Sequence, residues 1–277
     1  MNKKTVLKLI APFLALAICL SACGDPHKGQ VQVNDGTGLV WITPEAGVPV
    51  STLTQSDFSL DEDGEPAYKG ETFTVMKGID VSYYQGEIDW EKVAADGIEF
   101  AFIRCGYRGY TEGALKPDEQ FENNITGALK AGVKVGVYFF SQAVTAEEGR
   151  EEAEYVLKLI APYKVTMPVV FDWERIDGQT DARTNGLASD VLTDCAAAFC
   201  EAVKAGGYTP AVYFYPNTGY YGFELSKLTD YMFWLGRPGS YPDFYYAHAV
   251  WQYDFEGKVD GIKGNADMDM YFTPVQK

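Results

Sequence analysis

The sequence predicts a single α/β domain, a TIM-like (β/α) barrel, over residues 76–277. Short apolar runs alternate with stretches of helical periodicity through this whole region, and that alternation predicts βαβ units with parallel strands. Gly97, Gly132 and Gly206 follow three of the helical stretches, at positions where helices commonly end. About eight strands in roughly 200 residues fit a closed barrel better than an open sheet.

The individual elements follow from hydrophobic spacing. Runs that are short, apolar and rich in β-branched or aromatic residues predict strands at 78–81, 100–104, 134–139, 168–171, 209–214, 232–235 and 248–252. Apolar positions that recur every three to four residues predict helices at 89–96, 118–131, 146–160, 187–205 and, briefly, 225–229. In a barrel of this kind the functional residues gather at the carboxyl ends of the strands.

The first 75 residues have a different composition. Residues 1–22 begin with lysines, continue as an apolar run and end in small residues, as a secretory signal peptide does. The run Leu20-Ser-Ala-Cys23 resembles the lipobox of bacterial lipoproteins, which implies lipid attachment to Cys23, and an ordinary cleaved signal is the alternative. Residues 23–75 are rich in Gly, Pro, Thr and acids, so we interpret them as a lipid-anchored linker with short strands at 39–42 and 73–75.

Composition excludes several classes of function. The formal charge is −16 and 47% of the residues are hydrophobic, so the chain buries a core but does not attract nucleic acid. Histidine occurs only at His27 and His248, too few for a histidine zinc site or a Ser-His-Asp triad, and His248 is interpreted as structural. Three cysteines are interpreted as packing residues without disulfides, namely Cys105, Cys195 and Cys200. We expect neither a cofactor nor a metal.

Carboxylates fall at the ends of the predicted strands. Asp80 ends the first strand, Asp172 and Glu174 follow a later one, and Asp267 lies in the last segment. Residues two apart in extended backbone point the same way, so Asp172 and Glu174 share a face. Repulsion between two such carboxyls keeps one protonated while the other is ionised. Glycoside hydrolysis requires this pair, and a metal site built from the same acids is the competing use.

Several segments of the chain, including those that carry these acids, resemble family 25 of the glycoside hydrolases, the N-acetylmuramidase type of lysozyme. The matching segments occur in family order from residue 78 to residue 272 and cover the whole predicted domain. They are Gly78-Ile-Asp-Val-Ser-Tyr-Tyr-Gln-Gly86, Phe102-Ile-Arg-Cys-Gly-Tyr107, Ala131-Gly-Val-Lys-Val-Gly-Val-Tyr138, Pro168-Val-Val-Phe-Asp-Trp-Glu174, Trp251-Gln-Tyr253 and Gly264-Asn-Ala-Asp267-Met-Asp269.

The resemblance implies a flattened (β/α) barrel that cleaves the β-1,4 bond between N-acetylmuramic acid and N-acetylglucosamine in peptidoglycan. By matching position, Glu174 is the general acid/base, and Asp172 stabilises the charge that develops at the sugar. The family implies retention of configuration with the substrate's own N-acetyl group as nucleophile, although a nucleophilic Asp172 remains the alternative. Asp80 and Asp267 match two further groove acids, whereas Asp269 stands where Asn is common and receives no catalytic role.

Five further residues are candidate substrate contacts by the same resemblance, namely Tyr138, Trp251, Tyr213, Gln85 and Arg104. Tyr138 matches a tyrosine near the reacting sugar. Trp251 and Tyr213 stack on sugar rings in this interpretation, with core packing as the alternative. Gln85 either contacts substrate or serves a turn, and Arg104 is expected to pair with a groove acid. Residues 234–241 differ from the sequence that is typical of the family at this place. The resemblance therefore does not predict which sugars the subsites prefer.

The expected function is therefore a retaining peptidoglycan hydrolase, with glycan strands of the cell wall as its partner. Two alternatives stay open: a catalytically silent peptidoglycan-binding lipoprotein, and a hydrolase of another N-acetylated polysaccharide such as chitin. The lipobox implies a protein that acts outside the cytoplasm, held to a bacterial membrane by a lipid anchor and facing the wall. We expect a monomer.

Overall fold

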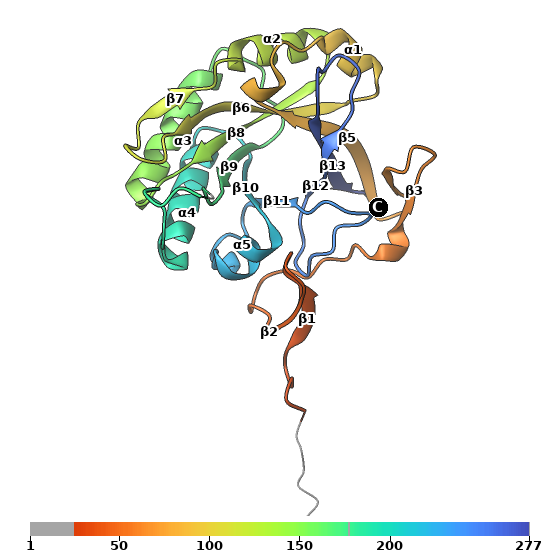
Figure 1. Cartoon of the computed structure of the whole chain (residues 1–277), viewed down its shortest axis with the longest axis vertical. Helices are drawn as coiled ribbons and strands as arrows, with labels where there is room; N and C mark the ends of the chain where they lie inside the picture. Colours follow the sequence, from red (N-terminus) through yellow and green to blue (C-terminus); the bar gives the residue numbers. More distant parts are fainter. Residues whose placement is uncertain (1–24, 177, 277) are drawn as a thin grey trace, which may run out of the picture.

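Apolar strands close into a barrel in the computed structural model, which describes residues 25–176 and 178–276 (Figure 1). The strands of the barrel are, in order around it, β5 (Phe73–Val81), β13 (Ala266–Pro274), β12 (Val250–Gly257), β11 (Met232–Gly236), β10 (Pro210–Phe214), β9 (Val169–Trp173), β8 (Lys134–Ser141) and β6 (Phe100–Arg108). Pairing of β6 with β5 completes the circle, and short β7 (Leu115–Pro117) adds to the outer edge of β6. The predicted α/β barrel is confirmed.

The strands are parallel except for the last. Each neighbouring pair from β5 through β12 is parallel, whereas β13 runs antiparallel to both β12 and β5. No strand was predicted at 266–274, so β13 adds an antiparallel strand to the predicted parallel units. The physical reason is its connection: residues 258–265 join β12 to β13 without a crossover helix, and only an antiparallel pair permits so short a link.

Helices cover one side of the barrel, along the arc from β5 to β10 in Figure 1. They are α1 (Trp90–Ala95), α2 (Phe121–Ala131), α3 (Ala146–Ile160) and α4 (Ser189–Ala205). Helix α2 ends at Gly132, whose φ of 83° is the left-handed conformation that glycine adopts without strain. Helix α3 begins at Thr145, whose side chain accepts from the Glu148 N–H. These four helices confirm the predicted ones.

Between β10 and β12 the connections hold only short elements. Helix α5 (Pro216–Tyr221) was not predicted, because six residues show too little periodicity, and the brief helix expected at 225–229 is a 3₁₀ turn, η3 (Leu225–Lys227). Two other 3₁₀ turns are η1 (Gln55–Asp57) and η2 (Tyr83–Gln85). Within the described residues, no helix is both long enough and apolar enough to cross a membrane.

Residues 25–72 form an ordered extension on the barrel, which differs from the tether expected for 23–75. Two hairpins form, from β1 (Val31–Asn34) with β2 (Leu39–Ile42) and from β3 (Phe58–Leu60) with β4 (Pro66–Tyr68). The Phe58 ring packs edge-on against Trp251 and Phe272. Burial of this aromatic side chain outweighs the polar composition that suggested a linker. The predicted strand at 39–42 is present, and the one at 73–75 is the start of β5.

The barrel interior changes from apolar to polar along the strands. Alternate residues point inward, and in β6 this inward series runs Phe100, Phe102, Arg104. In β9 it runs Val170, Asp172. Apolar side chains thus fill the amino-terminal end of the barrel, and polar side chains line the carboxyl end, where the pocket opens.

Candidate active site

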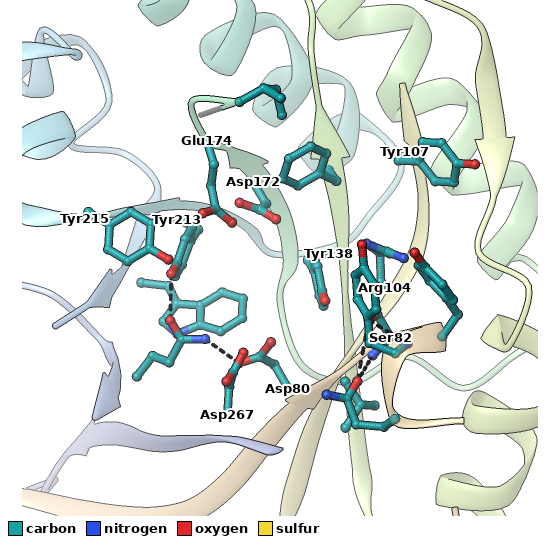
Figure 2. Close-up of a pocket in the computed structure, with 18 of the residues that line it drawn as sticks. Asp80, Ser82, Arg104, Tyr107, Tyr138, Asp172, Glu174, Tyr213, Tyr215 and Asp267 are labelled. Carbon is teal, nitrogen blue, oxygen red and sulfur yellow. Dashed lines mark hydrogen bonds between the residues drawn. The ribbon is translucent and has the colours of Figure 1, made fainter. Parts of the chain in front are cut away.

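Four acids that the sequence places in distant segments meet in one pocket. Asp80 lies in β5, Asp172 in β9, Glu174 directly after β9, and Asp267 at the start of β13. All four line a cavity of about 610 Å³ at the carboxyl end of the barrel (Figure 2). Because β13 is antiparallel to its neighbours, its amino-terminal end reaches the same rim as their carboxyl ends. The structure therefore brings these four sequence-predicted acids together.

Strand register explains this convergence. Asp80 and Asp267 are direct partners across β5 and β13. Asp172 is the partner of Tyr213 across β9 and β10. Trp173 points the opposite way and packs in the hydrophobic core outside the barrel, so Asp172 and Glu174 share the inner face as the strand period requires.

Asp80 is held by a hydrogen-bonded network that sequence reasoning missed. The Gln252 amide donates from Nε2 to Asp80 Oδ2 at 2.6 Å, and the Tyr213 hydroxyl donates to Gln252 Oε1 at 2.6 Å (Figure 2). Behind Asp80 lies Asp269, which is fully buried and accepts from Trp234 Nε1 at 2.9 Å. Strand alternation was the available signal for Gln252, because it places this residue inside the barrel whenever Trp251 is outside.

Burial and mutual repulsion perturb the acids. Burial raises the pKa of Asp172 well above its ordinary value, and the nearby Glu174 raises it further, while Arg104 opposes the shift. Burial also raises the pKa of Glu174, against a hydrogen bond from Tyr215. The pair therefore retains a proton at a pH where isolated carboxyls have lost theirs.

The Asp80 and Asp267 carboxyls show the same effect. Burial raises the pKa of Asp80, and the charges of Asp267 and Asp269 add to the shift. Burial, followed by Glu174 and Asp254, raises the pKa of Asp267 to about 7. A cluster of carboxyls with raised pKa values in a cavity is typical of acid–base catalysis.

Arg104 lies in the same pocket but pairs with an acid outside the catalytic group. Its Nε donates to Asp118 Oδ2 at 2.7 Å, and both side chains are largely buried. Its guanidinium also lies over the ring of Tyr83, 4.9 Å from the centroid. Arg104 was expected to pair with an acid of the groove, and this expectation is corrected: its partner is Asp118, which does not line the pocket. Arg104 acts on Asp172 only through its charge, which lowers the pKa of that carboxyl.

Aromatic side chains line much of the pocket. Tyr138 and Tyr213 both line the pocket, and Trp234 lies 4.8 Å from Tyr213, ring to ring. Tyr213 is buried and its hydroxyl is bonded to Gln252, so the packing alternative describes its contacts in this structure. Others were not singled out from the sequence, namely Tyr83, Tyr84, Tyr107 and Tyr215. The exposed ring of Tyr84 at the rim is suited to stack on a sugar.

Gln85 is a lining residue with a turn role. Its side chain accepts from the Ser82 N–H at 2.9 Å, and its amide donates to the Asn265 carbonyl at 3.3 Å. These bonds close η2 and tie the β5 end to the loop before β13. The turn alternative for Gln85 therefore describes its contacts in this structure, and the side chain still borders the cavity.

The prediction that Trp251 stacks on a sugar is wrong. Its side chain is fully buried, its Nε1 donates to the Arg237 carbonyl at 2.7 Å, and it does not line the pocket. The ring points outward from β12 into the core beneath Phe58. His248 is likewise buried outside the pocket, and burial lowers its pKa to about 4. Cys105, Cys195 and Cys200 are buried and unpaired, as expected.

The structure describes neither the predicted signal peptide nor the predicted lipidation site. Cys23 and the signal peptide at 1–22 lie outside the described residues. Within the described part of the chain, no group of three or more His, Cys, Asp or Glu side chains is arranged to hold a metal ion.

Known proteins share both the sequence and the fold. The chain is 27% identical to lysozyme M1 of Streptomyces globisporus, over 95% of this chain and 88% of that protein. A family 25 glycosyl hydrolase from Bacillus anthracis superposes with a TM-score of 0.59 at 25% identity, over 71% of this chain and 88% of that one.

The modular autolysin LytC of Streptococcus pneumoniae, solved with a synthetic peptidoglycan ligand, gives a TM-score of 0.59 at 20% identity over 85% of this chain. This chain spans 59% of LytC, so that comparison concerns the fold alone. The sequence profile of the glycosyl hydrolases family 25 matches residues 79–262, which include three of the four pocket acids. Profile, relatives and barrel agree, and the chain belongs to family 25 of the glycosyl hydrolases.

Proposed function

We propose that this protein hydrolyses peptidoglycan at the β-1,4 bond between N-acetylmuramic acid and N-acetylglucosamine. The observation that carries the proposal is the convergence of Asp80, Asp172, Glu174 and Asp267 in one cavity at the carboxyl end of a family 25 barrel. The names of the relatives support the substrate class, since one is a lysozyme and another is an autolysin solved with a peptidoglycan ligand.

Glu174 is the general acid in this proposal. Its side chain is only partly enclosed and borders open cavity, so it reaches the glycosidic oxygen, whereas Asp172 lies deeper. The raised pKa of Glu174 keeps a proton available, and Tyr215 orients the carboxyl. Glu174 gives its proton to the leaving oxygen as the bond from that oxygen to the anomeric carbon breaks.

Asp172 stabilises the positive charge that develops on the sugar. The substrate's acetamide oxygen then bonds to the anomeric carbon, and Asp172 accepts a hydrogen bond from the acetamide nitrogen in the resulting oxazolinium intermediate. Glu174, now ionised, removes a proton from a water molecule that attacks the anomeric carbon, and the acetamide is restored. Two displacements at one carbon give net retention. Arg104 favours the ionised form of Asp172 that this step requires.

Asp80 and Asp267 hold sugar hydroxyls and keep the cluster short of full ionisation. Asp80 has one oxygen fixed by Gln252, so its direction is set before substrate binds. No hydrogen bond between the Asp267 side chain and another described residue occupies this carboxyl, which faces the cavity. Tyr138 and Tyr213 complete the walls around the reacting sugar.

The lipobox adds a location to the proposal. A lipid on Cys23 holds the enzyme at the outer side of a bacterial membrane, facing the wall, as a resident remodelling enzyme. Salt or chelator should leave the protein in whole-cell membranes, and detergent should release it. Release without detergent would refute the anchor while leaving the hydrolase untouched.

The test of the function uses residues 24–277, which retain the extension packed on the barrel, and a Glu174→Gln variant. Purified peptidoglycan and chitin oligomers are incubated with each, and new reducing ends are identified by mass spectrometry. Reducing-end N-acetylmuramic acid from wild type alone supports the proposal. Binding to the wall without new ends in either protein would favour the silent binding lipoprotein. Cleavage of chitin with intact peptidoglycan would favour the other polysaccharide.

A further inference from the structure

A second cavity of about 420 Å³ adjoins the active site. It shares Glu174 and Tyr215 with the first cavity, so the two meet at the proposed general acid. Its other walls are the turn of the β1–β2 hairpin at residues 35–37, the start of α5 at 216–218, and the end of β11 with the two residues after it, 236–238. The hairpin wall lies outside the family profile, which begins at residue 79.

The hairpin is fixed against the barrel by polar contacts. Tyr221 of α5 donates from its hydroxyl to Asp35 Oδ2 at 3.2 Å. The Glu45 carboxylate, just after β2, accepts from the backbone N–H groups of Leu225 and Ser226 at 3.0 and 2.9 Å. Val50 forms a β-bridge with Tyr246. Contacts at both ends of the segment give the turn a defined place at the edge of the groove.

Two arginines make this cavity unusual in a chain of net charge −16. Arg237 and Arg175 both line it. The Arg237 Nε is buried with no hydrogen-bond partner among the described residues, and Arg237 Nη2 lies 3.8 Å from the nearest carboxylate oxygen of Asp243. No close ion pair among the described residues therefore holds either arginine, and their terminal guanidinium nitrogens keep donors for a ligand in the cavity.

Among the described residues, neither of the two acids that line the cavity, Asp35 and Glu174, forms an ion pair with Arg175 or Arg237. Asp35 is engaged by its own turn, since its Oδ1 accepts from the Thr37 N–H at 2.9 Å and from the Thr37 hydroxyl at 2.7 Å. Glu174 has a raised pKa and is the proton donor of the proposed reaction. An anionic group of the substrate therefore finds two guanidinium groups here, in a site that excludes part of the surrounding water.

We propose that the second cavity is a substrate subsite for a carboxylate of the peptidoglycan stem peptide, bound by Arg237 and Arg175. The inference rests on the proposed function, because Glu174 must stand at the glycosidic oxygen between two sugars. Substrate that passes Glu174 out of the first cavity enters the second, where it meets the arginines. Stem peptides present free carboxylates, and the lactyl group of N-acetylmuramic acid presents one only after the peptide is removed.

The experiment compares two substrates, intact peptidoglycan and the same glycan strands after amidase removal of the stem peptides. The variants are Arg175→Gln, Arg175→Glu and Arg237→Gln, with Lys130→Gln as the control. Lys130 is an exposed cation on α2, paired with Glu91 and remote from the groove. Arg175 is exposed, so its variants are expected to fold even if Arg237→Gln does not.

On intact peptidoglycan we expect kcat/KM to fall about three- to tenfold for either Gln variant, and further for Arg175→Glu, through a higher KM. On stripped glycan the variants should match wild type. Equal losses on both substrates would show that the arginines act on a group that both substrates share, and would overturn the stem-peptide assignment. A loss on stripped glycan alone would assign the bound carboxylate to the freed lactyl group and would overturn it too. Losses no larger than that of Lys130→Gln would overturn the subsite itself. Inactive wild-type protein would instead reject the proposed function.

Discussion

Replacement of Asp267 by Asn should stabilise the fold at alkaline pH while it impairs the enzyme. Burial raises the pKa of this carboxyl from 3.8 to about 7, with Glu174 and Asp254 as further causes. The folded state therefore holds the proton more tightly than the unfolded chain. The stability linked to this group is complete below pH 3.8 and is lost as the pH rises through about 7.

The size of the effect follows from the shift. About three pKa units correspond to an upper limit of about 4 kcal/mol, at roughly 1.4 kcal/mol per unit. The side chain is partly exposed, so solvent screening reduces the retained part to about 1–2 kcal/mol between pH 5 and pH 8.5. For a protein of this size, that is about 3–6 °C in the thermal midpoint.

The assay is thermal unfolding of wild type and Asp267→Asn at pH 5 and pH 8.5, followed by circular dichroism. The variant's advantage in midpoint should grow by this amount at the higher pH. Glu154→Gln on α3 serves as the control, because it removes one exposed negative charge far from the pocket. A pH-independent difference, or an advantage that is larger at pH 5, would refute the electrostatic reasoning.

Three further predictions concern neighbouring side chains. Gln252→Leu removes the amide that fixes Asp80, so kcat should fall about 10- to 100-fold in a reducing-end assay, and a change confined to KM would contradict this role. Trp251→Phe should lower the free energy of unfolding in denaturant by about 2 kcal/mol but leave kcat/KM unchanged, because the ring is buried in the core. A loss of activity with unchanged stability would show that Trp251 contacts the substrate. Arg104→Met leaves the buried Asp118 carboxylate without its ion-pair partner and should lower the free energy of unfolding by about 3 kcal/mol. The same variant should move the acid limb of the pH–rate profile to higher pH, since Arg104 lowers the pKa of Asp172; an unmoved limb would show that its charge does not reach the pair.

Sequence patterns predicted the barrel and the four pocket acids because both depend on local features. Hydrophobic spacing located the helices α1 to α4, and carboxylates at the ends of two predicted strands indicated Asp80, Asp172 and Glu174. Strand β13 was not predicted, and its antiparallel direction could not be, because strand polarity depends on the connection and its hydrogen bonds. Helix α5 was too short to show a period.

The errors around Trp251 and Gln252 have one cause. A motif identifies which residues are characteristic, but strand parity decides which of them face the pocket. In β12 the glutamine faces inward to Asp80 and the tryptophan faces outward to Phe58. The N-terminal extension was misjudged for a related reason: its polar composition suggested a linker, and only tertiary contacts such as Glu45 with η3 show that it packs on the barrel.

The most direct test of the central claim is the identity of the sugar at the reducing ends that residues 24–277 release from purified peptidoglycan. We expect reducing-end N-acetylmuramic acid from wild type and none from Glu174→Gln. Reducing-end N-acetylglucosamine would contradict the proposed bond, and equal turnover by Glu174→Gln would contradict the proposed acid.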